Sequence, residues 1–300
     1  MILRLSACTL SIGAFLFFLY GEAPSANAAD ESIEAGSGRF LHIDRASDDK
    51  RDITVHYHRP EGYKPNSPIL FVMHGNSRAA VRYWRQWEDQ AKKYNALILV
   101  PEFDTFDFPG SASYHSGGIY DVVSGDKKPK HQWTFSIIER IFDQARRLTG
   151  STQNTFHLYG HSAGGQFVHR YLTFTGGPKV KRAVAANPGW YTMPRTDIEY
   201  PYGLKDSPAT NDNLKTLFAS NLTILLGEDD TKQTRSLRQT AEAMDQGGHR
   251  LARGKKYYET GKTTAAELNL PFRWRIQIVP DVGHSNGEMA PAAASILFGH

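Results

Sequence analysis

Short apolar runs alternate along the chain with segments whose apolar residues recur every three or four positions. The first pattern is typical of buried strands and the second of helices. Strand-like runs lie at 53–58, 69–73, 96–100, 154–159, 181–187, 221–226 and 272–279, and helix-like segments at 79–94 and 133–148. The alternation predicts an α/β fold with a mostly parallel central sheet flanked by helices on both faces.

The order of these elements also indicates where a functional site is expected. Run 53–58 comes first and is expected to form an edge strand, and the other runs are expected to form the body of the sheet. In open parallel sheets, ligands bind at the carboxyl ends of the strands. The residues directly after each apolar run are therefore the first candidates for a functional site.

Run 154–159 leads into Gly160-His161-Ser162-Ala163-Gly164, which precedes an apolar, helix-compatible segment. A G-x-S-x-G sequence between a strand and a helix is typical of a nucleophile elbow, a sharp turn that exposes the serine hydroxyl. The turn needs flanking residues almost without side chains, and Gly160 and Gly164 satisfy that need. Ser162 is the predicted nucleophile.

A serine hydroxyl needs a base within hydrogen-bond reach and an acid that orients the base. Run 221–226 ends in Gly227-Glu228-Asp229-Asp230, so Asp229 and Asp230 are both candidates for the acid, with Glu228 as a weaker third. The competing interpretation is that these carboxylates cap a helix beginning near Thr231.

The base is predicted from the last strand-like run, 272–279, which continues into Pro280-Asp281-Val282-Gly283-His284. A histidine in a glycine-containing loop after a strand suits proton transfer. The alternative is a solvated surface histidine. His284 is the predicted base.

Acyl transfer also needs donors for the oxygen that becomes negatively charged. The amide of Ala163 follows the nucleophile at a helix N-terminus, where the helix dipole favours negative charge. The amide of Asn76 follows run 69–73 and is the second predicted oxyanion donor. His74 and His161 are expected to pack and hydrogen-bond next to these loops.

These motifs, in this order and each at a strand end, resemble the α/β-hydrolase fold superfamily and its small secreted serine esterases. A weaker resemblance is to the polyhydroxyalkanoate depolymerase and feruloyl esterase group. The resemblance favours Asp230 as the acid, because related hydrolases usually show Gly-x-x-Asp spacing. It implies a carboxylic ester hydrolase that works through an acyl-enzyme, without metal or cofactor, on a small ester or on a polymer such as a polyester or feruloylated polysaccharide. A peptidase or lactonase with the same triad, or a binding protein that kept the fold without turnover, is the alternative.

Two aromatic-rich segments are expected to form the substrate pocket. Segment 101–130 has the glycine content of a long irregular connection, and such connections are often functional. Segment 188–220 stands where this fold commonly carries a small lid-like insertion. Tyr114, Tyr120, Trp190 and Tyr191 are the predicted substrate-binding residues, and the alternative is that they pack the two segments onto the body.

The composition limits the number of domains and the kinds of partner that are expected. A chain of 300 residues with 40% hydrophobic content supports one domain, predicted over 29–300. The formal net charge is +4, and the basic residues are scattered, so no nucleic-acid partner is expected. His56 and His58 form an H-x-H pattern without the further ligands that zinc needs, so no metal site is expected.

The first 28 residues are typical of a cleaved signal peptide. Arg4 precedes an apolar stretch over 5–20, and Ala26-Asn27-Ala28 matches an A-x-A cleavage site. The protein is therefore expected to be secreted or periplasmic, without stable membrane association after cleavage. Cys8 is the only cysteine of the sequence, so the mature chain is expected to have no disulfide.

Overall fold

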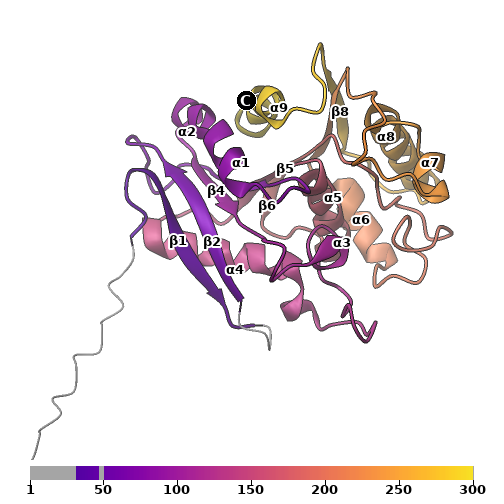
Figure 1. The fold of residues 1–300 in the computed structure, drawn as a ribbon, viewed down its shortest axis with the longest axis horizontal. Helices are drawn as coiled ribbons and strands as arrows, with labels where there is room; N and C mark the ends of the chain where they lie inside the picture. Colours follow the sequence, from indigo (N-terminus) through magenta and orange to yellow (C-terminus); the bar gives the residue numbers. More distant parts are fainter. Residues whose placement is uncertain (1–31, 47–50, 300) are drawn as a thin grey trace, which may run out of the picture. The chain divides into compact units, whose positions relative to one another are not determined.

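The strands form one eight-stranded sheet in a computed structural model that describes residues 32–46 and 51–299 (Figure 1). The predicted signal peptide, 1–28, lies outside the described residues. The strand order is β1-β2-β4-β3-β5-β6-β7-β8. The strands are β1 (Gly36–Asp44), β2 (Arg51–Arg59), β3 (Ile69–Met73), β4 (Leu97–Pro101), β5 (Phe156–His161), β6 (Val180–Ala186), β7 (Leu222–Gly227) and β8 (Arg275–Val279).

Most of the sheet is parallel. β2 pairs antiparallel with both β1 and β4, and β4, β3, β5, β6, β7 and β8 pair parallel with one another. The central strands β3, β4, β5 and β7 are buried along their whole length, as expected for strands covered on both faces. The carboxyl ends of β3, β5 and β7 therefore reach the same edge of the sheet.

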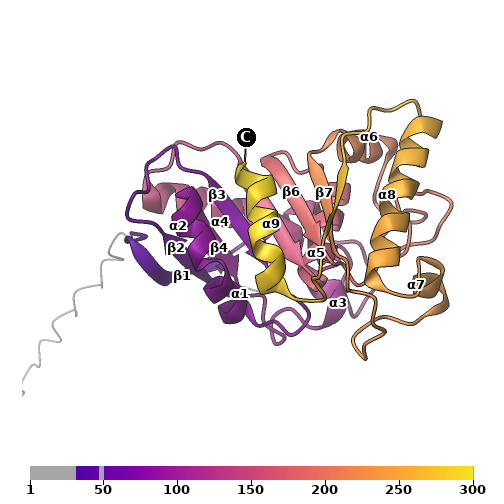
Figure 2. The same cartoon turned by 90° about the horizontal axis from the view of Figure 1, so that it is seen from above.

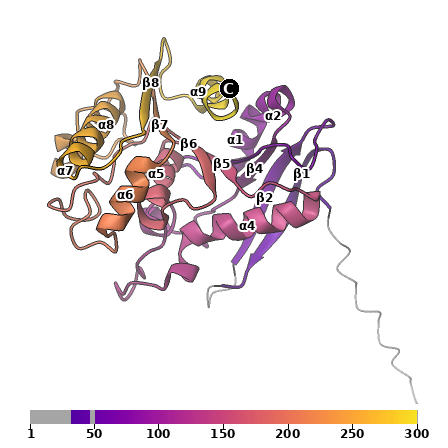
Figure 3. The ribbon, with the colours of Figure 1, turned by 180° about the vertical axis from the view of Figure 1, so that it is seen from behind.

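Helices cover both faces of this sheet. Figures 2 and 3 show α1 (Ala80–Gln86), α2 (Glu88–Tyr94) and α9 (Asn286–Phe298) on one side and α4 (Thr134–Thr149), α5 (Ala163–Thr175) and α6 (Asn211–Ala219) on the other. α8 (Arg250–Glu267) packs beside β7 and β8. Shorter helices lie in the connections: α3 (Gly110–Ser113), a 3-10 turn at Lys130–Gln132 and α7 (Ala241–Asp245). The predicted α/β fold class is confirmed.

Three local expectations differ from the structure. The run 53–58 belongs to β2, which is not an edge strand, because β1 pairs along its outer side. The segment 79–94 forms two helices rather than one, with the break at the fully buried Trp87. No helix begins near Thr231, because the next helix along the chain is α7.

The segment 188–220 contains an irregular stretch followed by α6. Several of its aromatic and aliphatic side chains are buried, namely Trp190, Tyr191, Met193, Tyr202 and Leu204. The segment is thus packed against its surroundings in this conformation, and its role as a lid stays a prediction. From Ser32 onward the described chain forms one compact unit.

α9 is held at both ends. Ser285 precedes it, and its hydroxyl accepts a hydrogen bond from the Glu288 amide, as an N-cap residue does. At the other end Arg182 of β6 donates to the carbonyl oxygens of Ile296, Leu297 and Gly299. Among the described residues no helix has the length and apolarity to cross a membrane.

Candidate active site

Ser162 lies at the turn between β5 and α5, with φ 59° and ψ −116°. A residue with a side chain rarely adopts such a φ, so the turn is strained and must be held by its surroundings. A Cβ on Gly160 would lie 2.1 Å from the Gly164 carbonyl oxygen, and one on Gly164 would lie 2.0 Å from the Met73 carbonyl oxygen. Both positions therefore require glycine, as the predicted elbow demands.

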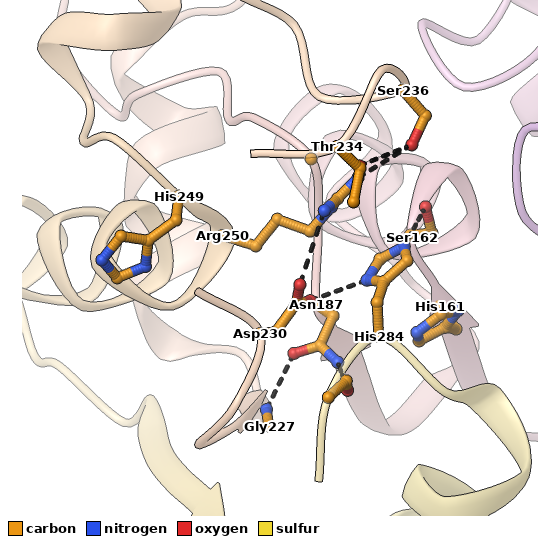
Figure 4. A network of polar contacts seen from close by, with 12 residues as sticks. His161, Ser162, Asn187, Gly227, Asp230, Thr234, Ser236, His249, Arg250 and His284 are labelled. Atoms are coloured by element: carbon orange, nitrogen blue, oxygen red, sulfur yellow. Dashed lines mark hydrogen bonds and ion pairs between the residues drawn. The ribbon is translucent and has the colours of Figure 1, made fainter. Parts of the chain in front are cut away.

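The side chains of Ser162, His284 and Asp230 form one hydrogen-bonded chain (Figure 4). His284 Nε2 lies 3.0 Å from Ser162 Oγ, and His284 Nδ1 lies 2.6 Å from Asp230 Oδ2. An ionised carboxylate only accepts hydrogen bonds, so Nδ1 carries the proton and Nε2 is free to accept from the serine hydroxyl. The arrangement is that of a serine nucleophile, its base and an orienting acid.

Asp230 is the carboxylate that turns inward. It is 2% exposed, whereas Glu228 and Asp229 are exposed to solvent. The turn after β7 places Asp230 over Gly227, whose carbonyl oxygen accepts from the Asp230 amide at 3.2 Å. Of the carboxylates considered for the acid, Asp230 is thus the one in contact with the imidazole.

Two polar residues that the sequence did not single out hold the loops of this site. Arg250, at the start of α8, has Nη1 3.4 Å from Asp230 Oδ1, and both side chains are almost fully buried. Asn187, directly after β6, accepts from the Gly227 amide at 2.8 Å and donates to the Gly283 carbonyl oxygen at 3.2 Å. Asn187 thus connects the loop of the acid to the loop of the base (Figure 4).

The only sequence signal for Asn187 was its position at the end of a predicted strand. Its backbone has φ 45°, a conformation that asparagine tolerates better than most residues. Arg250 lies 20 residues beyond Asp230, and nothing in the local pattern links the two. Only the folded chain brings Arg250 to the carboxylate.

His161 and His74 are buried supports, as the sequence indicates. The His161 ring lies 4.5 Å from the His284 ring, and its Nδ1 is 3.0 Å from the Tyr83 hydroxyl. Burial holds the pKa of His161 well below its usual value, and the neighbouring His284 ring adds to the lowering. Burial lowers the pKa of His74 to about 3, so its neutral ring accepts from the Phe103 amide at 3.1 Å.

Both predicted oxyanion donors belong to loops next to Ser162. Ala163 is the first residue of α5, and amides of the first helical turn have no acceptor within the helix. Asn76 follows β3 and lines the same cavity as Ser162. Gly75 between β3 and Asn76 lies against the ring of Tyr83, because an added Cβ would be 2.6 Å from the Tyr83 hydroxyl.

A cavity of about 680 Å³ opens beside Ser162. Residues from the oxyanion loop, from α1, from the loop before α7 and from the segment after β6 line it, with Asn76, Arg82, His115, Gln166, Trp190, Arg235, Arg238 and His284 among them. Its described lining holds four arginines, the fourth being Arg250, and neither aspartate nor glutamate. The described residues contain no group of three or more metal-ligating side chains.

Of the four aromatic residues expected to bind substrate, Trp190 lines this cavity and the other three do not. Tyr114 is fully buried, and its hydroxyl donates to the His74 carbonyl oxygen at 2.7 Å. Tyr191 is also fully buried and stacks on Tyr257, with ring centroids 4.4 Å apart. Tyr120 lies outside the cavity, and its hydroxyl donates to the Asp206 carbonyl oxygen.

The packing alternative therefore holds for these three tyrosines. Tyr114 and Tyr191 bury their aromatic rings in the core, and buried aromatic surface stabilises a core as readily as it lines a binding site. Tyr120 instead packs beside Tyr200 of the neighbouring segment, with ring centroids 5.7 Å apart. The structure therefore does not place Tyr114, Tyr120 and Tyr191 in the lining of the cavity beside Ser162.

Neither a protein-family model nor a curated protein matches the chain. Solved structures do. Poly(aspartic acid) hydrolase-1 from Sphingomonas sp. KT-1 is 44% identical, with a TM-score of 0.85 over 88% of this chain and 99% of that one. LpqC, a poly(3-hydroxybutyrate) depolymerase from Bordetella parapertussis, is 36% identical, with a TM-score of 0.83 over 88% of this chain and 91% of that one.

An IroE-like serine hydrolase from Shewanella oneidensis shares the fold alone, at 13% identity and a TM-score of 0.56 over 87% of this chain and 80% of that one. Fold, identity and coverage together show the family: the chain belongs to the α/β-hydrolase fold superfamily. Within it, the protein groups with esterases and depolymerases. It is a carboxylic ester hydrolase.

Proposed function

We propose that this protein is a secreted serine hydrolase that cleaves carboxylic esters through an acyl-enzyme, with Ser162, His284 and Asp230 as its catalytic triad. One observation carries the proposal: the continuous hydrogen-bonded chain from the buried Asp230 carboxylate through the imidazole to the Ser162 hydroxyl. Three side chains from three separate loops meet at Ser162, whose backbone has the positive φ of a nucleophile elbow.

In the proposed reaction Ser162 Oγ attacks the ester carbonyl carbon while its proton passes to His284 Nε2. The carbonyl oxygen gains negative charge and is bound by the amides of Ala163 and Asn76. The C–O bond to the leaving group then breaks, and the imidazolium donates its proton to the departing oxygen. Water then attacks the acyl carbon while its proton passes to the same ring. The bond between the acyl carbon and Ser162 Oγ breaks, and the imidazolium returns the proton to Oγ, which releases the acid and restores the serine hydroxyl.

The second relative supports a polymer as the substrate. LpqC is named a poly(3-hydroxybutyrate) depolymerase, and this chain covers 91% of its length. A polyester is therefore one candidate, and an aryl or feruloyl ester is another. Trp190 is the aromatic side chain in the cavity that either acyl chain would meet.

Cleavage of an amide bond, in addition to ester bonds, is a second candidate activity. The relative with 44% identity over 99% of its length is named a poly(aspartic acid) hydrolase, and poly(aspartic acid) is a polyamide. The same three residues suit both reactions, because the triad fixes acyl transfer and leaves the leaving group open. Assays with poly(3-hydroxybutyrate), a feruloyl ester and poly(aspartic acid) side by side separate the candidates by the products released.

Export rests on the leader sequence alone. The residues of the A-x-A site predict a mature chain that begins at Ala29. Expression of the full-length gene followed by N-terminal sequencing of the exported protein tests this. A product that keeps residues 1–28 and stays in the cytoplasm contradicts it.

A fluorophosphonate probe tests the proposed nucleophile, because it reacts only with a serine activated by a neighbouring base. The probe should label the wild-type protein and Ser77→Ala, which removes another hydroxyl of the cavity, and should not label Ser162→Ala. Mass spectrometry should place the adduct on Ser162. Equal labelling of Ser162→Ala contradicts the triad, and absence of label on all three proteins supports a binding protein without turnover.

A further inference from the structure

Arg170 is a fully buried cation beside the cavity. It lies on α5, two turns after the nucleophile, and is 0% exposed. Its Nε donates to Thr192 Oγ1 at 2.8 Å, and its Nη1 donates to His115 Nδ1 at 2.7 Å and to Gln166 Oε1 at 3.2 Å. Among the described residues no aspartate or glutamate forms an ion pair with it, and its Nη2 has no hydrogen-bond partner.

Such burial is unfavourable unless something compensates for the charge. Burial lowers the pKa of Arg170 to about 9, and the charge of Arg238 also lowers it. The group is still protonated at neutral pH. A buried charge is normally paired with an opposite charge, because the free energy lost when the charged group leaves water exceeds the free energy gained from hydrogen bonds to neutral groups. The compensating anion is therefore expected from outside the described chain.

The buried guanidinium lies against the wall of the catalytic cavity. Three of the side chains that it contacts, His115, Gln166 and Trp190, line that cavity together with Ser162. Burial and the neighbouring Arg170 hold the pKa of His115 well below its usual value. His115 thus stays neutral, and the positive charge behind this part of the wall belongs to Arg170.

Trp190 lies between this buried cation and a second arginine. Arg170 Cζ is 4.0 Å from the centroid of the Trp190 ring, and Arg238 Cζ is 4.8 Å from it. Arg238 lines the cavity and is half-buried, and its Nε donates to the Tyr202 hydroxyl at 2.6 Å. Two cations of like charge gather at one indole, and neither forms a close ion pair with a carboxylate among the described residues; the exposed Glu242 interacts with Arg238 only at longer range.

Arg238 is also held in place from behind. Arg253, which is fully buried, donates to the carbonyl oxygens of Arg238 and Gly189. The backbone that carries Arg238 is thereby joined to the backbone beside Trp190. Arg170 and Arg238 are consequently held in the cavity wall by hydrogen bonds and packing, unlike freely moving surface side chains.

We propose that Arg238, Trp190 and the buried Arg170 form a carboxylate-binding subsite of the catalytic cavity. The substrate that fits this subsite carries a carboxylate on its acyl chain, the part of the substrate that is attached to the carbonyl group attacked by Ser162. Arg238 would bind the carboxylate directly, through charge-assisted hydrogen bonds. Arg170 would act through the wall, as a fixed positive charge in a region of low dielectric. The absence of acidic side chains from the described lining suits the same anionic substrate.

This inference rests on the proposed function, and a matched pair of substrates separates the two. The p-nitrophenyl ester of hexanoic acid and the p-nitrophenyl monoester of adipic acid share the leaving group and the acyl chain length. They differ in a terminal methyl against a terminal carboxylate. The wild-type enzyme should favour the adipate ester in kcat/KM by about 10- to 100-fold, the range expected for one hydrogen-bonded charge pair.

Arg238→Met should lower the adipate-to-hexanoate ratio of kcat/KM by at least about 10-fold, and Arg238→Lys should keep most of it. Arg147→Met on α4 is the matched control, because it removes one exposed arginine away from the cavity and should leave the ratio unchanged. Raising NaCl from about 0.05 M to about 0.5 M should shrink the wild-type ratio through screening. Arg170→Gln should lower the ratio as well; if it does not fold, Arg238→Met decides.

Equal wild-type turnover of the two esters would overturn the subsite and leave the triad intact. The same conclusion follows if Arg238→Met lowers kcat/KM for both esters by the same factor. Failure to hydrolyse either ester, together with failure of the fluorophosphonate probe, would instead overturn the proposed function.

Discussion

The guanidinium of Arg250 lies 3.4 Å from Oδ1 of Asp230, and both side chains are nearly inaccessible to solvent. The other carboxylate oxygen, Oδ2, faces His284. Arg250 also donates to the hydroxyls of Thr234 and Ser236 in the loop that borders the cavity. It therefore fixes the orientation of the proposed acid and ties that acid to the cavity wall.

Replacing Arg250 with Met should lower both kcat and the free energy of unfolding, because it leaves the buried Asp230 carboxylate without its cation. Arg250→Lys should restore part of both effects because it restores the charge. Assays of the three proteins with a neutral ester, together with urea unfolding, make the measurements. Wild-type kcat and wild-type stability in Arg250→Met would contradict a role for Arg250 in holding the acid.

Asn187→Ala should destabilise the fold and lower kcat together. The substitution leaves the buried Gly227 amide without its acceptor and removes the donor to Gly283, which costs about 1–3 kcal/mol. Asn187→Asp keeps the acceptor for the Gly227 amide, but at neutral pH it buries a negative charge against the Gly283 carbonyl oxygen, so it should destabilise the fold as well. Urea unfolding of the three proteins measures the difference. Equal stability of Asn187→Ala and wild type would mean that this side chain does not hold the two loops together.

The two glycines around the site should respond differently to alanine. Gly164→Ala places a methyl group 2.0 Å from the Met73 carbonyl oxygen, and backbone atoms must move to accommodate it, at a cost of roughly 1–3 kcal/mol or more. Gly283→Ala meets its nearest neighbour, the Asp229 carbonyl oxygen, at 3.9 Å, which is ordinary contact. Thermal unfolding should thus show a large drop in Tm for the first variant and a small change for the second. Equal drops would contradict the elbow geometry.

Acid should destabilise the protein through its buried histidines. Burial, with Lys181 and Arg182 nearby, lowers the pKa of His157 from 6.5 to about 3. The unfolded chain therefore binds a proton below about pH 6.5 that the folded chain takes up only near pH 3. Stability is complete above about pH 6.5 and falls as the pH drops through that window.

His157→Phe removes one of these proton-binding side chains. Residue 157 lies near the end of β5 that is farther from Ser162. The variant should lose less stability than wild type between about pH 6.5 and 4, as measured by urea unfolding. At about pH 8, where neither chain binds the proton, the comparison gives the packing effect of the substitution alone. A pH dependence as steep as that of wild type would show that His157 does not carry this proton linkage.

Local patterns predicted most of the sheet, because each central strand is a continuous apolar run bounded by turn residues. β1 has no such signal. Its inward residues are Phe40, His42 and Asp44, while Leu41 and Ile43 are exposed, so its apolar residues lie on both faces. α8 is similar, because the positions it buries include Arg250, Arg253, Gly254 and Thr264 rather than an apolar stripe.

The same division applies to the site. The residues around Ser162, Asp230 and His284 are local to their strand ends, and sequence spacing was sufficient to propose them. Contacts between elements that are distant in the sequence could not be predicted from spacing. Arg250 contacts Asp230 from the start of α8, and Tyr114 is buried in the core although its segment borders the cavity. Aromatic content in a loop indicates a large buried area without saying which side of the loop is buried.

The anchoring of α9 makes catalysis a sensitive reporter of partial unfolding. His284 is held between β8 and the Ser285 cap of α9, and Arg182 fastens the far end of that helix. Detachment of α9 alone would carry the imidazole away from Ser162 while leaving the rest of the secondary structure in place. Under mild heating or denaturant, turnover should then disappear before the circular dichroism signal changes.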